Sequence, residues 1–140
     1  MHHEITSVWK GGMQFDAEVL GYTISFDETH DDGTPMLGTS PKRTLLAAVG
    51  ACTGIDVVSM LKKMRVPFDS LSISVGADAA EAHPKVYTQM KIIYHLRGAG
   101  LEEHREQIEH AVSLSQEKYC SVSAMLRKAM EVSAEILINQ

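Results

Sequence analysis

The chain has 140 residues, enough for one domain with a core of its own and no need of disulfides. It is 44% hydrophobic and 22% charged, and its net charge of −5 gives no reason to expect a nucleic-acid partner. No apolar run approaches the roughly 20 residues that span a bilayer, so no membrane contact is expected. The N-terminus, MHHEITSVWKGG, lacks a signal-peptide pattern, which predicts a cytoplasmic protein with reduced cysteines.

The first 40 residues predict a small sheet followed by a loop. Residues 3–10 alternate weakly between apolar and polar and predict a strand, and Gly11-Gly12 is a turn signal. Residues 13–20 are expected to form the hairpin partner, and residues 22–26 a third short strand. Residues 27–40 have no periodicity and are expected to form a long loop.

Residues 39–65 predict the longest helix of the chain and its centre. Ser40 is the expected N-cap and Pro41 the first helical residue. Mostly apolar residues recur at steps of three and four and fall on two adjoining stripes of the helix surface. A helix that is apolar on two stripes is expected to be deeply buried. One stripe holds Leu45, Val49, Cys52, Asp56 and Met60, and the other holds Leu46, Gly50, Thr53, Val57, Leu61 and Met64.

The second half predicts a hairpin, two helices and a closing element. Residues 71–75 and 85–96 alternate and are expected to pair as strands, and residues 101–115 are expected to form an amphipathic helix. Residues 121–130 predict a further helix, capped by Ser121 or Ser123. Residues 131–137 fit either a continued helix or a final strand, and their period of two favours the strand. The fold class is therefore α+β, a single domain over residues 1–140 with the long helix packed on antiparallel sheet.

Cys52 and Cys120 are the only thiols. They stand 68 residues apart, which excludes a CxxC pair and a four-cysteine zinc site. A buried Cys52 fits the role of a small hydrophobe, and Asp56 that of a core hydrogen-bonding group. Cys120 precedes a predicted helix, where the dipole favours a thiolate, so the two thiols also fit peroxide reduction through a sulfenic acid and a disulfide. The histidine spacing gives no metal signal, and no cofactor is expected.

The run SPxxxLLAAxxAC at Ser40–Cys52, its continuation TGIDVVSMLKKMR, and a second cysteine within YCSVS resemble the OsmC/Ohr family of osmotically inducible and organic hydroperoxide resistance proteins. The resemblance covers nearly the whole chain and is greatest to a YhfA-like branch. It implies an intertwined homodimer with the long helices buried and the sites at the interface. It also implies reduction of organic hydroperoxides, with Cys52 as the peroxidatic and Cys120 as the resolving thiol, and a dithiol as reductant.

The chain departs from the family pattern at the residues that orient and ionise the reactive thiol. Active members carry an arginine after the glycine turn and a glutamate after the helix-starting proline. Here Met13 stands in the first position, and Lys42 and Arg43 follow Pro41. The replacement cation is then expected from Lys10, Lys42 or Arg43, and the carboxylate from Asp56, Glu102 or Glu103. Asp56 alone would hinder ionisation of Cys52, because a nearby anion disfavours a thiolate.

Two functions follow from this sequence. The first is a thiol-dependent peroxidase for organic hydroperoxides. The alternative is a non-catalytic dimer that binds a small hydrophobic ligand at its interface. The homodimer itself is also expected from the central helix, because two apolar stripes exceed what one hairpin layer on each side covers.

Overall fold

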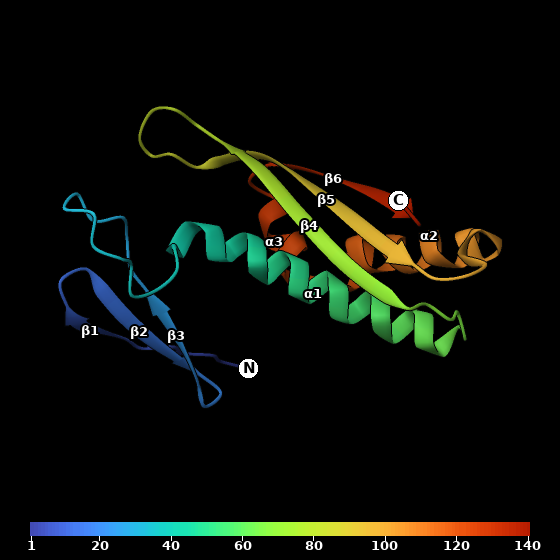
Figure 1. Ribbon diagram of the computed structural model, residues 1–140, viewed down its shortest axis with the longest axis horizontal. Helices are drawn as coiled ribbons and strands as arrows, with labels where there is room; N and C mark the ends of the chain where they lie inside the picture. Colours follow the sequence, from blue (N-terminus) through green and yellow to red (C-terminus); the bar gives the residue numbers. More distant parts are fainter. The chain divides into compact units, whose positions relative to one another are not determined.

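The computed structural model describes all 140 residues and contains two compact units, residues 1–45 and 46–140, which we describe separately. The family fold class, α+β, is confirmed (Figure 1). The expectation that residues 1–140 form a single domain stays a prediction. In chain order the elements are β1 Ser7–Gly11, β2 Gln14–Val19, β3 Tyr22–Phe26, α1 Pro41–Lys63, β4 Ser70–Ala79, β5 Tyr87–Arg97, a 3₁₀ turn Leu101–His104, α2 Arg105–Leu114, a π-helical turn Ser115–Tyr119, α3 Ser121–Arg127 and β6 Glu131–Ile138.

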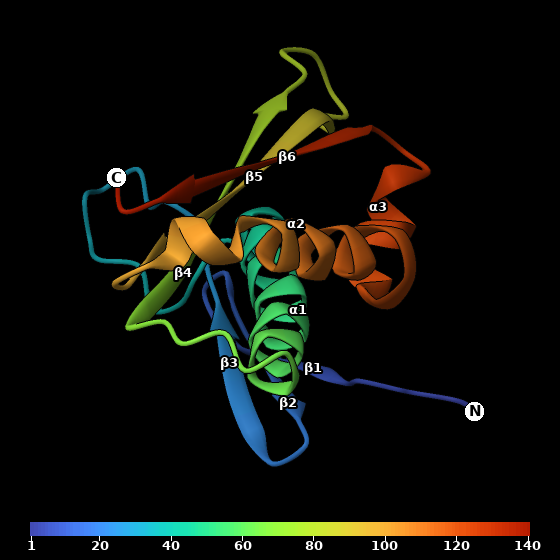
Figure 2. The ribbon, with the colours of Figure 1, turned by 90° about the vertical axis from the view of Figure 1, so that its right-hand side faces the viewer.

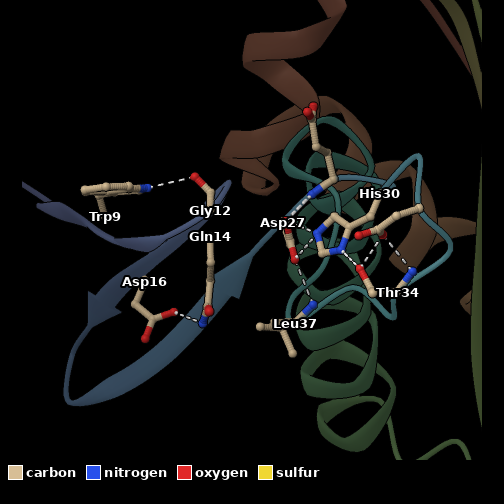
Figure 3. Close-up of polar contacts among 10 residues, drawn as sticks. Trp9, Gly12, Gln14, Asp16, Asp27, His30, Thr34 and Leu37 are labelled. Atoms are coloured by element: carbon tan, nitrogen blue, oxygen red, sulfur yellow. Dashed lines mark hydrogen bonds and ion pairs between the residues drawn. The ribbon is translucent and has the colours of Figure 1, made fainter.

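The first unit contains the three predicted strands as an antiparallel sheet in the order β1-β2-β3. The strand expected over residues 3–10 begins later, at Ser7. Gly11 and Gly12 adopt positive φ of 105° and 56°, a backbone that glycine takes without a side-chain clash. Figure 3 shows how the Trp9 indole N–H closes this turn by donating to the Gly12 carbonyl over 2.9 Å.

The predicted loop between β3 and α1 is ordered around the carboxylate of Asp27 (Figure 3). Asp27 is 3% exposed and accepts the backbone N–H groups of Glu28 at 2.8 Å and Leu37 at 2.9 Å. The His30 ring lies 3.0 Å away, and its other nitrogen contacts Thr34 at 2.6 Å. These contacts fold a segment without helix or strand into a fixed conformation, because they satisfy a buried carboxylate.

Helix α1 begins at Pro41, as predicted, and the Ser40 hydroxyl accepts the N–H of Arg43 at 3.4 Å. All members of the two predicted stripes except Leu45 are buried or half-buried. Within the chain one face is fully buried, by Val49, Thr53, Val57 and Leu61. Leu45 is 45% exposed, and Ile55, which lies on neither stripe, is 72% exposed.

The same helix corrects the expectation that no apolar run approaches membrane-spanning length. An 18-residue window of α1 has a mean hydropathy of 1.8, and by length and composition alone the helix could cross a bilayer. Core helices meet the same criterion. Val49, Val57 and Leu61 of α1 pack into the central cluster of the second unit.

The second unit is a three-stranded sheet, β4-β5-β6, with helices α1, α2 and α3 on one face (Figures 1 and 2). Alternate residues of β5 point into that core, as its period of two predicted: Met90, Ile92, Tyr94 and Leu96. Residues 131–138 form the favoured strand and not a continued helix. β6 pairs in parallel with β5, so the sheet is mixed, whereas the sequence predicted antiparallel pairing throughout.

The segment between the sheet strands β5 and β6 differs in detail from the prediction. The helix expected over residues 101–115 is a 3₁₀ turn followed by α2, and a π-helical turn, Ser115–Tyr119, leads out of it. The N-cap of α3 is Cys120, where Ser121 or Ser123 was predicted. This shift places a thiol, and not a hydroxyl, at the start of the helix.

Candidate functional site

Cys120 is held at the junction of the π-helical turn and α3. Its N–H donates to the Ser115 carbonyl at 2.8 Å, which closes the π turn. Its sulfur accepts the N–H of Ser123 at 3.4 Å and lies 3.1 Å from the Ser123 hydroxyl. The residue is 1% exposed. A wide helical turn of this kind is rare and is found frequently at functional sites.

Cys52 is half-buried on the flank of α1, beside the first turn of α3. Burial raises the pKa of its thiol above the ordinary value. The backbone N–H of Val122 beside the Cys52 sulfur lowers that pKa, while the neighbouring Cys120 sulfur raises it. The negative charge of Asp56 raises the pKa further, so the resting Cys52 is a thiol.

The two sulfurs therefore meet at one place. Successive backbone N–H groups of α3, those of Val122 and Ser123, face Cys52 and Cys120 respectively. Cys52 comes from a long helix and Cys120 from a turn 68 residues later in the chain. Sulfur atoms that are neighbours can form a disulfide once one of them is oxidised.

A chain of buried hydroxyl groups lies next to the two thiols. The Thr53 oxygen is 2.6 Å from the Tyr94 hydroxyl and 2.7 Å from the Ser115 hydroxyl. Ser115 donates in turn to Oδ2 of Asp56 at 2.8 Å. Burial raises the pKa of Tyr94, so its hydroxyl keeps its proton at neutral pH.

Gln116 and Arg127 fix one end of this chain. The Gln116 side-chain amide donates to Tyr94 at 2.7 Å and to Thr53 at 3.2 Å. Arg127 donates to the Gln116 backbone carbonyl and to its Oε1, both at 2.8 Å. No buried side-chain nitrogen or oxygen in the structure lacks a partner, so the network is fully satisfied.

Of the predicted thiol-tuning residues, Asp56 is the one that the structure brings to the thiols. Glu102 is bound instead by Arg105, at 2.8 Å, which lowers the pKa of Glu102. Glu103 is exposed in the same 3₁₀ turn. Lys10 on β1, and Lys42 and Arg43 in the first turn of α1, are exposed residues of the first unit.

Sequence reasoning missed the partners of Asp56, although one signal was present. Thr53 stands between Val49 and Val57 on the buried stripe, and a hydroxyl there requires a partner. Tyr94 lies on the apolar face of β5 and meets the same requirement. Gln116 and Arg127 gave no such signal, because their pairing depends on the unpredicted π turn. No group of three or more His, Cys, Asp or Glu side chains is placed to hold a metal ion.

A wide apolar hollow of about 810 Å³ follows the opposite flank of α1 and the strand β4. It does not include Cys52 or Cys120. Its lining is formed by Leu46, Ala47, Gly50, Ala51, Gly54, Ile55, Val58, Ser59, Lys62, Leu71, Ile73 and Val75.

The fold and the paired sulfurs define an α+β protein with a two-thiol site on its central helix. The chain belongs to the OsmC-like protein family, whose model matches residues 30–135. It is 33% identical over 126 residues to Protein YhfA of Escherichia coli K12, which covers 89% of this chain and 90% of that protein. The predicted family resemblance, including the YhfA-like branch, is confirmed.

Solved structures agree with this assignment. A hypothetical protein from Aquifex aeolicus VF5 superposes with a TM-score of 0.81 at 30% identity, covering 100% of this chain and 99% of that one. An organic hydroperoxide resistance protein OsmC from Legionella pneumophila superposes with a TM-score of 0.63 at 14% identity, covering 96% of each chain. At that identity the likeness is one of fold.

Proposed function

We propose that the protein is a thiol-dependent peroxidase that reduces organic hydroperoxides. The observation that carries the proposal is the meeting of Cys52 and Cys120 at the first turn of α3. Family membership supports it, and so does the fold shared with a protein named for organic hydroperoxide resistance.

The reaction uses each sulfur once. The Cys52 thiolate attacks the distal oxygen of RO–OH, the O–O bond breaks, and Cys52 becomes a sulfenic acid while the alcohol leaves. The Cys120 thiol then attacks the Cys52 sulfur, forms the disulfide and releases water. A dithiol reductant reduces this disulfide by thiol–disulfide exchange, becomes oxidised itself and restores both thiols. The cycle needs reduced cysteines at its start, which fits the expected cytoplasmic location and a role in oxidative stress.

We further propose that the working form is a homodimer. The exposed flank of α1 carries Ile55 at 72% exposure in the middle of a long apolar helix, beside the hollow along β4. The first unit buries a single apolar side chain, Ala17, and leaves Trp9 and Tyr22 exposed. Apolar surface of this extent indicates a protein partner, and a second copy is the one that symmetry favours.

The test of the peroxidase is a mass measurement. One equivalent of an organic hydroperoxide added to the reduced protein should give an intramolecular Cys52–Cys120 bond and a loss of about two daltons per chain. Cys52→Ser should abolish peroxide consumption in the presence of a dithiol. Cys120→Ser should leave a sulfenic acid on Cys52 that a dione reagent traps and that over-oxidises. Two unreacted thiols after this treatment would remove the proposal.

The second candidate is a dimeric protein that binds a small hydrophobic ligand at its interface. The apolar hollow beside α1 favours it, as do the raised pKa of Cys52 and Met13 in the place of the family arginine. An apolar fluorescent probe that binds in a 1:1 ratio to wild type and equally to Cys52→Ser, with no peroxide turnover by wild type, would select this function.

A further inference from the structure

The site holds a thiol that rests protonated, so its chemistry requires a group that takes the proton. We propose that Asp56 is that group: it accepts the Cys52 proton as the sulfur attacks and returns it to the departing alkoxide. Asp56 replaces the glutamate that this chain lacks after Pro41. This inference rests on the proposed peroxidase function.

The position of Asp56 follows from the helix. Cys52 and Asp56 are four residues apart on α1, a spacing that places side chains next to each other on one face. Both are half-buried, and the charge of Asp56 acts on Cys52. Side chains at this spacing have Cβ atoms about 5–6 Å apart, a separation that one water molecule can bridge between a carboxylate and a sulfur.

The hydrogen bonds around Asp56 have one possible direction. A carboxylate only accepts, so Ser115 must donate to Oδ2 of Asp56, and the Ser115 oxygen must then accept from Thr53. Thr53 has now used its proton and accepts from the Tyr94 hydroxyl. The oxygens of Tyr94 and Thr53 also accept the two N–H bonds of the Gln116 amide.

Arg127 makes this direction permanent. Its guanidinium donates to Oε1 of Gln116, so the amide cannot turn and must present its NH₂ group to the hydroxyl chain. Every hydroxyl proton of the chain therefore points toward Asp56. The series of hydroxyl groups binds Oδ2 of Asp56 and orients the carboxylate. Oδ1 accepts no hydrogen bond, so this oxygen is available to exchange the proton with Cys52. Thr53, Ser115 and Tyr94 are positioning residues in this scheme.

The charge of Asp56 acts on Cys52 of its own helix and on Tyr94 of β5, and Cys120 at the cap of α3 acts on both. Arg127 joins the same network through Gln116. The site thus raises the pKa of Cys52 at rest and relies on proton transfer at the moment of reaction.

The proton balance closes over the first half-reaction. Cys52–SH and the Asp56 carboxylate become a thiolate and a carboxylic acid. The thiolate attacks RO–OH and forms Cys52–SOH and an alkoxide. The alkoxide takes the proton from Asp56 and leaves as ROH. The peroxide gains two electrons, which the Cys52 sulfur supplies, and Asp56 ends as the carboxylate with which it began.

The test compares Asp56→Asn with its parent in a Cys120→Ser background, where Cys52 is the one thiol that reports. Removal of the charge should lower the pKa of Cys52, so iodoacetamide should alkylate Asp56→Asn faster at neutral pH. The rate of sulfenic-acid formation with an organic hydroperoxide should nevertheless fall at least tenfold, within the range that general acid–base catalysis contributes. Glu106→Gln, an exposed carboxylate on α2, should change neither rate.

The two readouts separate the possible outcomes. A peroxide rate that rises with the alkylation rate in Asp56→Asn would overturn the role of Asp56, because thiolate formation alone would then set the rate. A parent protein that forms no sulfenic acid at all would instead remove the peroxidase function. If Asp56→Asn does not fold, Ser115→Ala carries the test: it should slow the peroxide reaction and leave alkylation unchanged, and an unchanged peroxide rate would overturn the proposal.

Discussion

Tyr94 illustrates at the scale of single residues how the core and the site share the same atoms. Its ring belongs to the hydrophobic core formed by β5, α1 and α2, while its hydroxyl joins the polar chain that ends on Asp56. A buried tyrosine of this kind contributes apolar area and a hydrogen bond at once. The network can therefore be fixed in place without any loss of packing.

Tyr94→Phe is expected to lower the free energy of unfolding by about 1–3 kcal/mol, because it leaves a buried donor of Gln116 without an acceptor. Urea denaturation of the reduced protein measures the change. Tyr22→Phe is the matched control: Tyr22 is 78% exposed on β3, so its loss of a hydroxyl should change the free energy by less than about 0.5 kcal/mol. Equal effects of the two substitutions would contradict the satisfied network.

The sequence indicated part of this site and not the rest. The separate roles of Cys52 and Cys120 came from the family resemblance, and the four-residue step to Asp56 came from helical periodicity. The contacts of Asp56 could not follow from either. Ser115 is 59 residues away along the chain, and its hydroxyl reaches Asp56 from the first residue of the π turn that follows α2. Local sequence patterns carry no information on contacts of that separation.

At the scale of elements, the ordered segment between β3 and α1 depends on one buried charge. Backbone N–H groups, first that of Leu37, lower the pKa of Asp27, and His30 lowers it further. A carboxyl with a lowered pKa stabilises the folded state at pH values above its unfolded pKa, about 3.9, and loses this contribution as the pH falls through the folded pKa. The segment should therefore be stable at neutral pH and open in acid below about pH 4.

Asp27→Asn should remove this pH dependence and weaken the segment already at neutral pH, because the amide keeps one oxygen where the carboxylate has two. The measurement is amide hydrogen exchange at Leu37 and Glu28, corrected for intrinsic rates, from about pH 2 to about pH 7, a range that extends well below the ordinary aspartate pKa of about 3.9. Asp31→Asn is the control, an exposed carboxylate in the same segment. Equal protection at Leu37 in the wild type and in Asp27→Asn would refute the role of the buried charge.

Elements with a clear period were predictable, and their ends and partners less so. β5 agrees with the prediction because the alternation in residues 85–96 is a local pattern. The start of α1 agrees because the N-cap Ser40 and the first helical residue Pro41 also act locally. Whether residues 131–138 pair in parallel or antiparallel depends on how the chain returns to the sheet. Two helices and a π turn precede this strand, and its own side chains do not encode their path.

At the scale of the whole molecule, the chain buries one face of its central helix and leaves another open. Val49, Val57 and Leu61 are fully buried, whereas Ile55 on the opposite face of the same helix is exposed. Ile55 lies outside the two predicted stripes, so the helix carries apolar surface beyond the part that one chain covers. The apolar surface of α1 that one chain leaves exposed is the physical basis for the proposed homodimer.

Ile55→Asp should break that homodimer and leave the fold of each chain intact. The substitution places a charge in the apolar hollow along α1, where burial against a second copy would cost several kcal/mol without a partner. Light scattering at micromolar concentration should report dimer mass for the wild type and monomer mass for Ile55→Asp, with unchanged far-ultraviolet circular dichroism. Met125→Asp, at 63% exposure on α3 outside the hollow, should remain dimeric. A wild-type protein of monomer mass, or an Ile55→Asp variant that dimerises as well as Met125→Asp, would show that this flank of α1 is not the contact between copies.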